Sequence, residues 1–128
     1  MARLTGNLVT PQGLLHGTIT FSNIIEDVAA TSEPRADIYI LPGFIDTHVH
    51  GGGGGDTMAG PRGVRKLAKF HLQHGTTTLY PTTITNPWDN ITKALRGVQE
   101  VMSEPSNDLP DIPGVHLEGP FISPKRLG

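Results

Sequence analysis

The spacing of hydrophobic and polar positions changes once along the chain, near residue 38. Before that point apolar residues alternate or cluster in short runs, in RLTGNLVT, GLLHGTITF and IIEDVAA. Turn-forming PQG and SN separate these runs, so the pattern predicts a β meander over residues 3–30. The polar stretch TSEPRAD then predicts a break before the next folded segment.

After the break, β-rich runs alternate with longer helical stretches. The run ending in IDTHVH predicts a strand that begins after Pro42 and Gly43. The next apolar residues recur at helical spacing and predict a helix over roughly 61–74, with Pro61 in its first turn and Gly75 at its end. Its predicted buried stripe is Val64, Leu67, Ala68, His71 and Leu72.

A second strand and helix repeat this order. TTTLYPTTIT is rich in β-branched residues and predicts a strand. Asn86 is the expected N-cap of the following helix, with Pro87 in its first position. GVHLEG, residues 114–119, predicts a third strand. The predicted buried stripe of the second helix is Trp88, Ile91, Leu95, Val98 and Met102.

The order strand–helix–strand–helix–strand predicts an α/β fold with a parallel sheet and right-handed crossovers. Three strands covered on one side leave an open edge and an uncovered face, and no helix closes the chain after FISPKRLG. We therefore expect residues 42–128 to be the first βα units of a larger barrel, incomplete at Gly128. Residues 1–41 are expected to form a separate small β domain.

Composition restricts the possible functions. The formal net charge is −2, which disfavours a protein that binds nucleic acid or anionic membranes through bulk charge. The chain has no cysteine, so disulfides and thiolate metal sites are excluded. Any metal must then be bound by His, Asp or Glu. The chain shows neither a signal-peptide core nor a membrane-length apolar run, and we expect a cytoplasmic protein.

Two predicted strand ends carry candidate metal ligands. Side chains alternate faces along a strand, so His48 and His50 point the same way, together with Asp46. In the third predicted strand His116 and Glu118 share one face. If the apolar faces meet the helices, His48, His50 and Glu118 converge at the C-terminal strand ends, where barrel active sites form. Two imidazoles and one carboxylate suit a divalent cation.

Other interpretations of these residues stay open. A His-x-His pair alone is more often a surface or core feature, and the metal hypothesis depends on the pair and Glu118 together. His116 is either a group that orients Glu118 or a packed histidine, and Asp46 is a similar candidate. The glycine run that begins with Gly51 and Gly52 is either a loop that approaches a substrate anion or a flexible connection.

Two sequence blocks resemble a known family. LPGFIDTHVHGGGGGDTM resembles the first-strand motif of the amidohydrolase superfamily. HGTTTLYPTTIT with GVHLEGPFISPKRLG more specifically resembles the N-acetylglucosamine-6-phosphate deacetylase family. The resemblance implies a metal-dependent (β/α)8 barrel flanked by a small β-sandwich, to which residues 1–41 would belong. It implies that Glu118 binds the catalytic metal and that His48 and His50 complete a second position.

The resemblance also implies a chemistry: hydrolysis of the acetamide of N-acetylglucosamine 6-phosphate, with one or two divalent ions, Zn or Fe, per subunit. It further implies a homodimer, and an acid/base aspartate and two further metal histidines downstream of residue 128. On this reading the 128-residue chain alone is inactive. The alternatives are an amidohydrolase acting on a cyclic amide or on adenine, and a non-catalytic module that binds metal or phosphate.

Overall fold

The computed structural model describes residues 1–33 and 37–126, which form two compact units. The first unit is Met1–Pro42 and the second begins at Gly43. The predicted polar break falls partly on residues 34–36, and the last motif ends on Leu127 and Gly128. Both of these segments lie outside the described residues.

The first unit is a four-stranded sheet in the order β3-β2-β1-β4. Strands β1 (Ala2–Thr10), β2 (Gly13–Phe21) and β3 (Ile25–Ala30) follow one another as antiparallel neighbours, which confirms the predicted meander. The short strand β4 (Tyr39–Ile40) pairs in parallel with β1. The described residues of this unit form a single sheet, and its membership of a β-sandwich stays a prediction.

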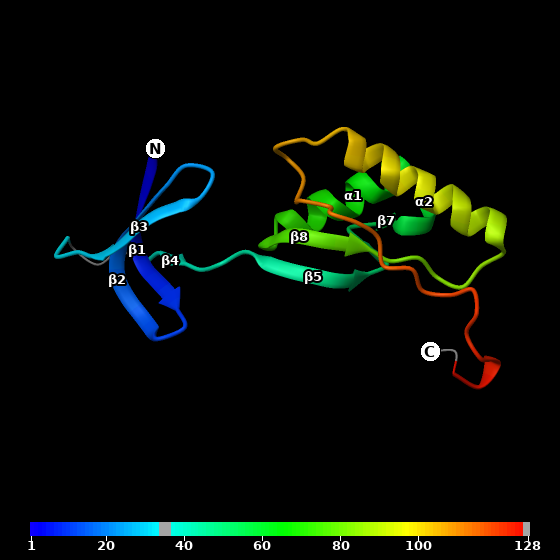
Figure 1. The fold of residues 1–128 in the computed structure, drawn as a ribbon, viewed down its shortest axis with the longest axis horizontal. Coiled ribbons are helices and arrows are strands. Elements are labelled where there is room, and N and C mark those ends of the chain that lie inside the picture. Colours follow the sequence, from blue (N-terminus) through cyan, green and yellow to red (C-terminus); the bar gives the residue numbers. More distant parts are fainter. Residues whose placement is uncertain (34–36, 127–128) are drawn as a thin grey trace. The chain divides into compact units, whose positions relative to one another are not determined.

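The second unit is built on two parallel strands, β5 (Phe44–Val49) and β8 (Thr76–Pro81). A short hairpin, β6 (Gly51–Gly52) and β7 (Gly55–Asp56), follows β5, and a 3-10 turn, η1 (Thr57–Ala59), leads into helix α1 (Pro61–Leu72). Helix α2 (Trp88–Ser103) follows β8, and a second 3-10 turn, η2, covers Pro124–Arg126. The elements follow one another as β5, α1, β8 and α2, which confirms the predicted βαβα order. Both long helices lie on the same side of β5 and β8 (Figure 1).

The core lies between the helices and the strands. Val64, Leu67 and Ala68 of α1 are fully buried, as predicted, whereas His71 and Leu72 of the predicted stripe are only half-buried. The three buried residues pack in one cluster with Leu79 of β8 and Val98 of α2. Burying each large side chain contributes about 1.5–3 kcal/mol relative to leaving it in water. This cluster therefore fixes the strand ends relative to the helices.

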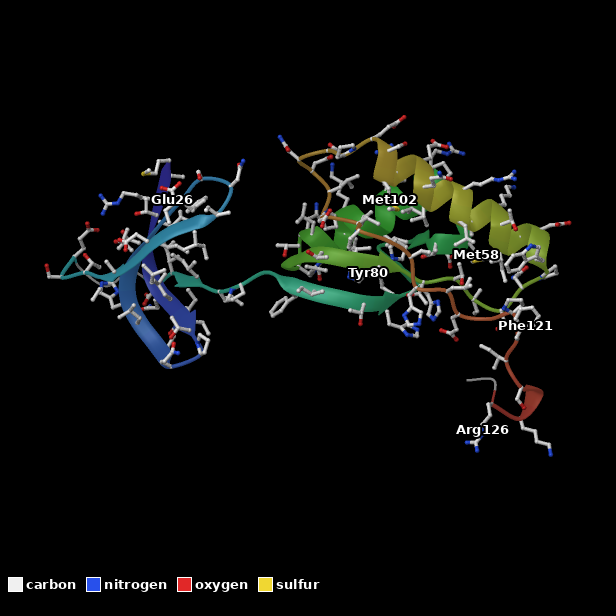
Figure 2. The ribbon with its side chains drawn as sticks, viewed as in Figure 1. Glu26, Met58, Tyr80, Met102, Phe121 and Arg126 are labelled. Atoms are coloured by element: carbon white, nitrogen blue, oxygen red, sulfur yellow. The ribbon has the colours of Figure 1, made fainter. Side chains whose placement is uncertain are left out.

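The predicted stripe of α2 is partly wrong. Trp88 is 56% exposed and Met102 is also exposed on this helix (Figure 2). The reason is Gly97, where an added Cβ would lie 3.0 Å from the Cα of Gly60. Small residues allow the closest helix approach, so α2 turns its small-residue face inward. The buried residues are Ile91, Ala94, Gly97, Val98 and Val101.

The predicted start of α2 is also one residue early. The helix begins at Trp88, and Pro87 takes the N-cap position. The side chain of Asn86 caps no backbone N–H; its Oδ1 accepts a hydrogen bond of 2.7 Å from Nδ2 of Asn90. The backbone carbonyl of Pro87 accepts from the amides of Asn90 and Ile91 and begins the helix.

The predicted third strand, residues 114–119, is wrong as a regular strand. Among the described residues, the segment that begins at Asp111 and includes 114–119 runs beside β8 but forms only isolated parallel bridges, Thr78 with Asp111 and Thr82 with His116. Two prolines explain the interruption, because Pro81 on β8 and Pro113 on the segment both lack the N–H that a ladder requires. Regular pairing is lost between the two bridges, and the segment stays extended without becoming a strand.

The glycine run is a packed hairpin and not a flexible connection. Gly53 and Gly54, with φ of 57° and 79°, form the left-handed turn between β6 and β7. Gly52 and Gly55 lie against α1, where an added Cβ at Gly55 would come 2.5 Å from the backbone nitrogen of Leu67. The side chain of His71 on α1 is bonded to the carbonyl of Gly51, with Nε2 at 3.1 Å. Glycine is required here for close packing.

No helix in the described part of the chain is both long enough and apolar enough to cross a membrane.

Candidate metal centre

Three side chains meet at the C-terminal end of β5. Nε2 of His48 lies 3.0 Å from Oε2 of Glu118, and Nε2 of His50 lies 3.3 Å from the same oxygen. The two Nε2 atoms are 3.1 Å apart. The structure therefore brings together the three residues that the sequence singled out, although Glu118 lies about seventy positions away in the chain.

These distances fit a common cation. Zinc binds nitrogen and carboxylate oxygen at about 2.0–2.2 Å, so two ligands of a tetrahedral site are separated by about 3.3 Å. The three measured separations, 3.0, 3.1 and 3.3 Å, are close to that value. The donor set, two imidazoles and one carboxylate, also suits zinc and other first-row divalent ions.

The surroundings of Glu118 also favour a divalent cation at this site. Its Oε2 atom is buried and forms no hydrogen bond with any described residue, although two imidazole nitrogens are within 3.3 Å. A buried carboxylate oxygen without a hydrogen bond is costly. A cation held by all three atoms would satisfy this oxygen, so the residues present fit a divalent metal.

The ring of His50 is oriented by β8. Its Nδ1 is 3.2 Å from the backbone carbonyl of Thr82, and a carbonyl oxygen only accepts, so Nδ1 carries the proton. The Nε2 lone pair is then free to bind a cation, as in metal sites where histidine donates its other N–H to a carbonyl.

His48 is held by a different pair of groups. Its backbone N–H donates to Oδ1 of Asp46 at 3.0 Å, which ties the end of β5 to the aspartate. Its ring meets the ring of His116 edge-on, with 4.6 Å between the centroids. His116 Nδ1 donates in turn to the carbonyl of Thr47 at 2.8 Å. Asp46 and His116 thus lie beside the ligand cluster but are not in it.

Gly51 and Gly52, the substrate-loop candidates, are half-buried beside α1. An added Cβ at Gly52 would lie 2.5 Å from Nε2 of His71, so the packing on α1 accounts for a glycine there. A role toward substrate stays a prediction for both residues.

The cluster is open on one side. The side chains of His48, His50 and Glu118 are 49%, 42% and 33% exposed, which leaves room for further ligands or a substrate. A shallow pocket of about 320 Å³ adjoins it, lined by Thr47, Tyr80, Val115, His116 and Leu117. With neutral imidazoles the three side chains carry a net charge of −1, which favours a cation.

Two threonines at the end of β8 were missed as site residues by sequence reasoning. Thr82 Oγ1 accepts from the amide of Val49 at 2.8 Å and donates to the carbonyl of Tyr80 at 3.1 Å. Thr83 Oγ1 bonds to the backbone of Glu118. Both side chains are fully buried. The signal in the sequence is a pair of hydroxyls directly after Pro81, which the β-branched pattern of TTTLYPTTIT assigns only to a strand.

Residues 39–127 match the Amidohydrolase family. The chain belongs to the amidohydrolase family. It is 43% identical over 114 residues to an N-acetylglucosamine-6-phosphate deacetylase of Bacillus subtilis, a match that covers 87% of this chain and 29% of that protein. It is 33% identical over 105 residues to an N-acetylgalactosamine-6-phosphate deacetylase of Escherichia coli O157:H7, covering 81% of this chain and 28% of that protein.

A solved structure is similar to this amidohydrolase chain. The crystal structure of an N-acetylglucosamine-6-phosphate deacetylase from Thermotoga maritima superimposes with a TM-score of 0.82 at 29% identity. The match covers 97% of this chain and 34% of that one. The chain thus spans about a third of the length of its relatives, and this third has the amidohydrolase fold as a mixed α/β segment.

Proposed function

We propose that this chain contributes the first metal-binding segments of a deacetylase. The proposed reaction is hydrolysis of the acetamide of N-acetylglucosamine 6-phosphate to glucosamine 6-phosphate and acetate. The observation that carries the proposal is the convergence of His48, His50 and Glu118 within 3.0–3.3 Å of one another. The similarity to deacetylases of amino-sugar phosphates supports the choice of substrate class.

The three residues would hold one or two divalent ions, with Zn or Fe as the expected metal. A bound divalent ion lowers the pKa of water toward about 7 and polarises a carbonyl, which is the chemistry that amide hydrolysis requires. Within the chain, the carbonyl of Thr82 orients the imidazole of His50. Asp46 fixes the backbone of His48, and His116 packs on its ring.

Amide hydrolysis also needs a group that transfers a proton to the leaving amine. Among the described residues the ligand cluster contains one carboxylate, Glu118, and metal binding occupies it in this proposal. We therefore place the acid/base group on another segment of a complete (β/α)8 barrel. The half-exposed side of the cluster, next to the pocket at His116, is the side on which such a group and the substrate would meet the metal.

Acetate release from N-acetylglucosamine 6-phosphate by the full-length protein tests the proposal. Replacing Glu118 with Gln keeps the shape of the side chain but weakens metal binding. Losing a group that only supports a metal ligand typically costs up to about 100-fold in activity, so we expect the loss of the ligand itself to lower acetate release by at least about 100-fold. Glu104→Gln is the matched control, because Glu104 pairs with Arg65 on the helical side and should keep full activity. Full acetate release by Glu118→Gln would contradict the proposal.

Metal content tests the ligand assignment independently of activity. His48→Ala should lower the bound Zn or Fe measured by elemental analysis after dialysis. His74→Ala is the matched control, because His74 lies at the end of α1, where its Nδ1 donates to the carbonyl of Phe70. Equal metal content in both variants would exclude His48 as a ligand.

A second substrate is favoured by one comparison. The Escherichia coli relative is an N-acetylgalactosamine-6-phosphate deacetylase, so the 4-epimer of the sugar is a candidate as well. Comparing kcat/KM for the two sugar phosphates decides between them, and ammonia release from adenine tests the deaminase alternative. The proposal includes a homodimer, which the mass of the full-length protein in solution tests.

A further inference from the structure

We infer that Thr83 is a positioning residue for the metal centre, acting through the backbone of Glu118. The inference rests on the metal-binding part of the proposed function and goes beyond it, because the hydroxyl of Thr83 bonds to the backbone of Glu118 and acts on the carboxylate only through it. Its hydroxyl accepts a hydrogen bond from the Glu118 amide at 3.0 Å and donates one to the Glu118 carbonyl at 3.1 Å. One side chain therefore binds both backbone polar groups of one ligand residue.

The hydroxyl of Thr83 matters because the segment that carries Glu118 is not a regular strand. Regular pairing with β8 fails between the Thr78–Asp111 bridge and His116, where Pro81 and Pro113 both lack an N–H, and it resumes at His116, whose amide donates to the carbonyl of Pro81. The amide of Thr83 then donates to the carbonyl of His116 at 3.1 Å. Beyond His116, no strand in the described part of the chain pairs with the backbone, and the Thr83 hydroxyl takes that role at Glu118.

The surroundings make this contact rigid. The Thr83 side chain is fully buried, so water does not compete for its hydroxyl. The residue after Glu118 is Gly119, which lies against Thr85. A Cβ added to Gly119 would come 2.5 Å from Oγ1 of Thr85. Thr83 therefore holds the backbone of Glu118, and Thr85 packs against the backbone of the following residue, Gly119. Its carboxylate reaches the two imidazoles from a fixed starting point.

Zinc affinity of the full-length protein tests this inference. Thr83→Val keeps the shape and removes the hydroxyl, and we expect the zinc dissociation constant, measured by competition with a chromophoric chelator, to rise by about 10–100-fold. Thr83→Ser restores the hydroxyl and should restore the affinity. Thr18→Val is the matched control: Thr18 is a buried threonine of the first unit whose hydroxyl bonds to Thr5, and its loss should leave zinc binding unchanged.

Two further readouts separate positioning from simple destabilisation. At saturating Co²⁺, Thr83→Val should shift the visible d–d bands, because the carboxylate has moved, whereas Thr18→Val should not. In a Glu118→Gln background, Thr83→Val should weaken zinc binding no further, because its effect passes through that carboxylate.

Wild-type zinc affinity in Thr83→Val, or an equal loss in both backgrounds, would overturn the inference. If zinc binding depends on Thr83 in this way but the wild-type protein releases no acetate, the deacetylase proposal is refuted and the inference about Thr83 stands.

Discussion

The packed glycine hairpin gives a prediction that separates close packing from chain flexibility. Gly55 and Gly54 are neighbours in the β6–β7 hairpin, but their surroundings differ. A Cβ on Gly55 would lie 2.5 Å from the nitrogen of Leu67 and 2.6 Å from the carbonyl oxygen of Gly63, both backbone atoms of α1. A Cβ on Gly54 would meet only the flexible end of Lys66, at 3.0 Å, although φ there is +79°.

The expected costs follow from these contacts. Gly55→Ala forces the hairpin away from the helix, and overpacking of this kind costs about 2 kcal/mol. Gly54→Ala leaves the packing intact and costs only the left-handed backbone penalty, about 1 kcal/mol. A flexible loop would instead make the substitution at Gly55 nearly neutral, because Gly55 needs no positive φ.

Hydrogen exchange of the full-length protein, read by mass spectrometry on peptides covering residues 50–58, measures the local effect. This region includes the amide of Thr57, which donates to the carbonyl of His50 at 2.8 Å. We expect exchange to speed up about 30-fold in Gly55→Ala and about fivefold in Gly54→Ala. Unchanged exchange in Gly55→Ala, or a larger effect in Gly54→Ala, would refute the packing argument.

Two further predictions concern stability. Leu67→Ala removes a fully buried side chain from the core and should lower the free energy of unfolding by about 3–4 kcal/mol. The control Leu14→Ala, at an exposed position, should change the free energy of unfolding little. Equal urea midpoints for the two variants would contradict the assignment of Leu67 to the core. The hydroxyl of Ser106, and then the ammonium of Lys69, hold the pKa of Asp108 below its ordinary 3.8. This carboxylate therefore contributes stability above pH 3.8 that is lost as the pH falls through its folded pKa. Asp108→Asn should lower the urea midpoint at neutral pH and not in strong acid, and a carboxyl that titrates at its ordinary value would contradict the prediction.

Much of the second unit could be predicted from local sequence patterns. The helical spacing of Val64, Leu67 and Ala68 defined the buried face of α1, and these three residues are fully buried. The two-residue spacing of His48 and His50 placed both rings on one side of β5, because strand side chains alternate. Adding Glu118 required only that its segment run parallel to β8 and end at the same edge, a direction that the isolated parallel bridges confirm.

The predictions that failed depend on contacts between distant residues. Pro81 and Pro113 remove two N–H groups from the same stretch of pairing only because the chain brings that part of β8 beside residues 111–116, and neither residue alone excludes a strand. The rotation of α2 follows from the contact between Gly97 and Gly60, which its own hydrophobic pattern does not contain.

The two buried threonines show a different limit. In sequence, Thr82 and Thr83 favour a strand and give no indication of a partner. Their hydroxyls replace backbone pairing where β8 ends, and that role exists only once Val49 and Glu118 have been brought beside them. Side chains that complete an irregular sheet cannot be recognised until the irregularity is known.

The anchored hairpin after His50 also constrains how this site can diversify. In barrel enzymes the loops that follow strands are the usual place for new specificity. The hairpin that follows β5 is attached to α1 through the bond between His71 and Gly51, so inserted residues would disturb both the core and the candidate ligand His50. Loop exchanges aimed at new substrates should therefore be tolerated better at the exposed Phe121 (Figure 2) than in the glycine run.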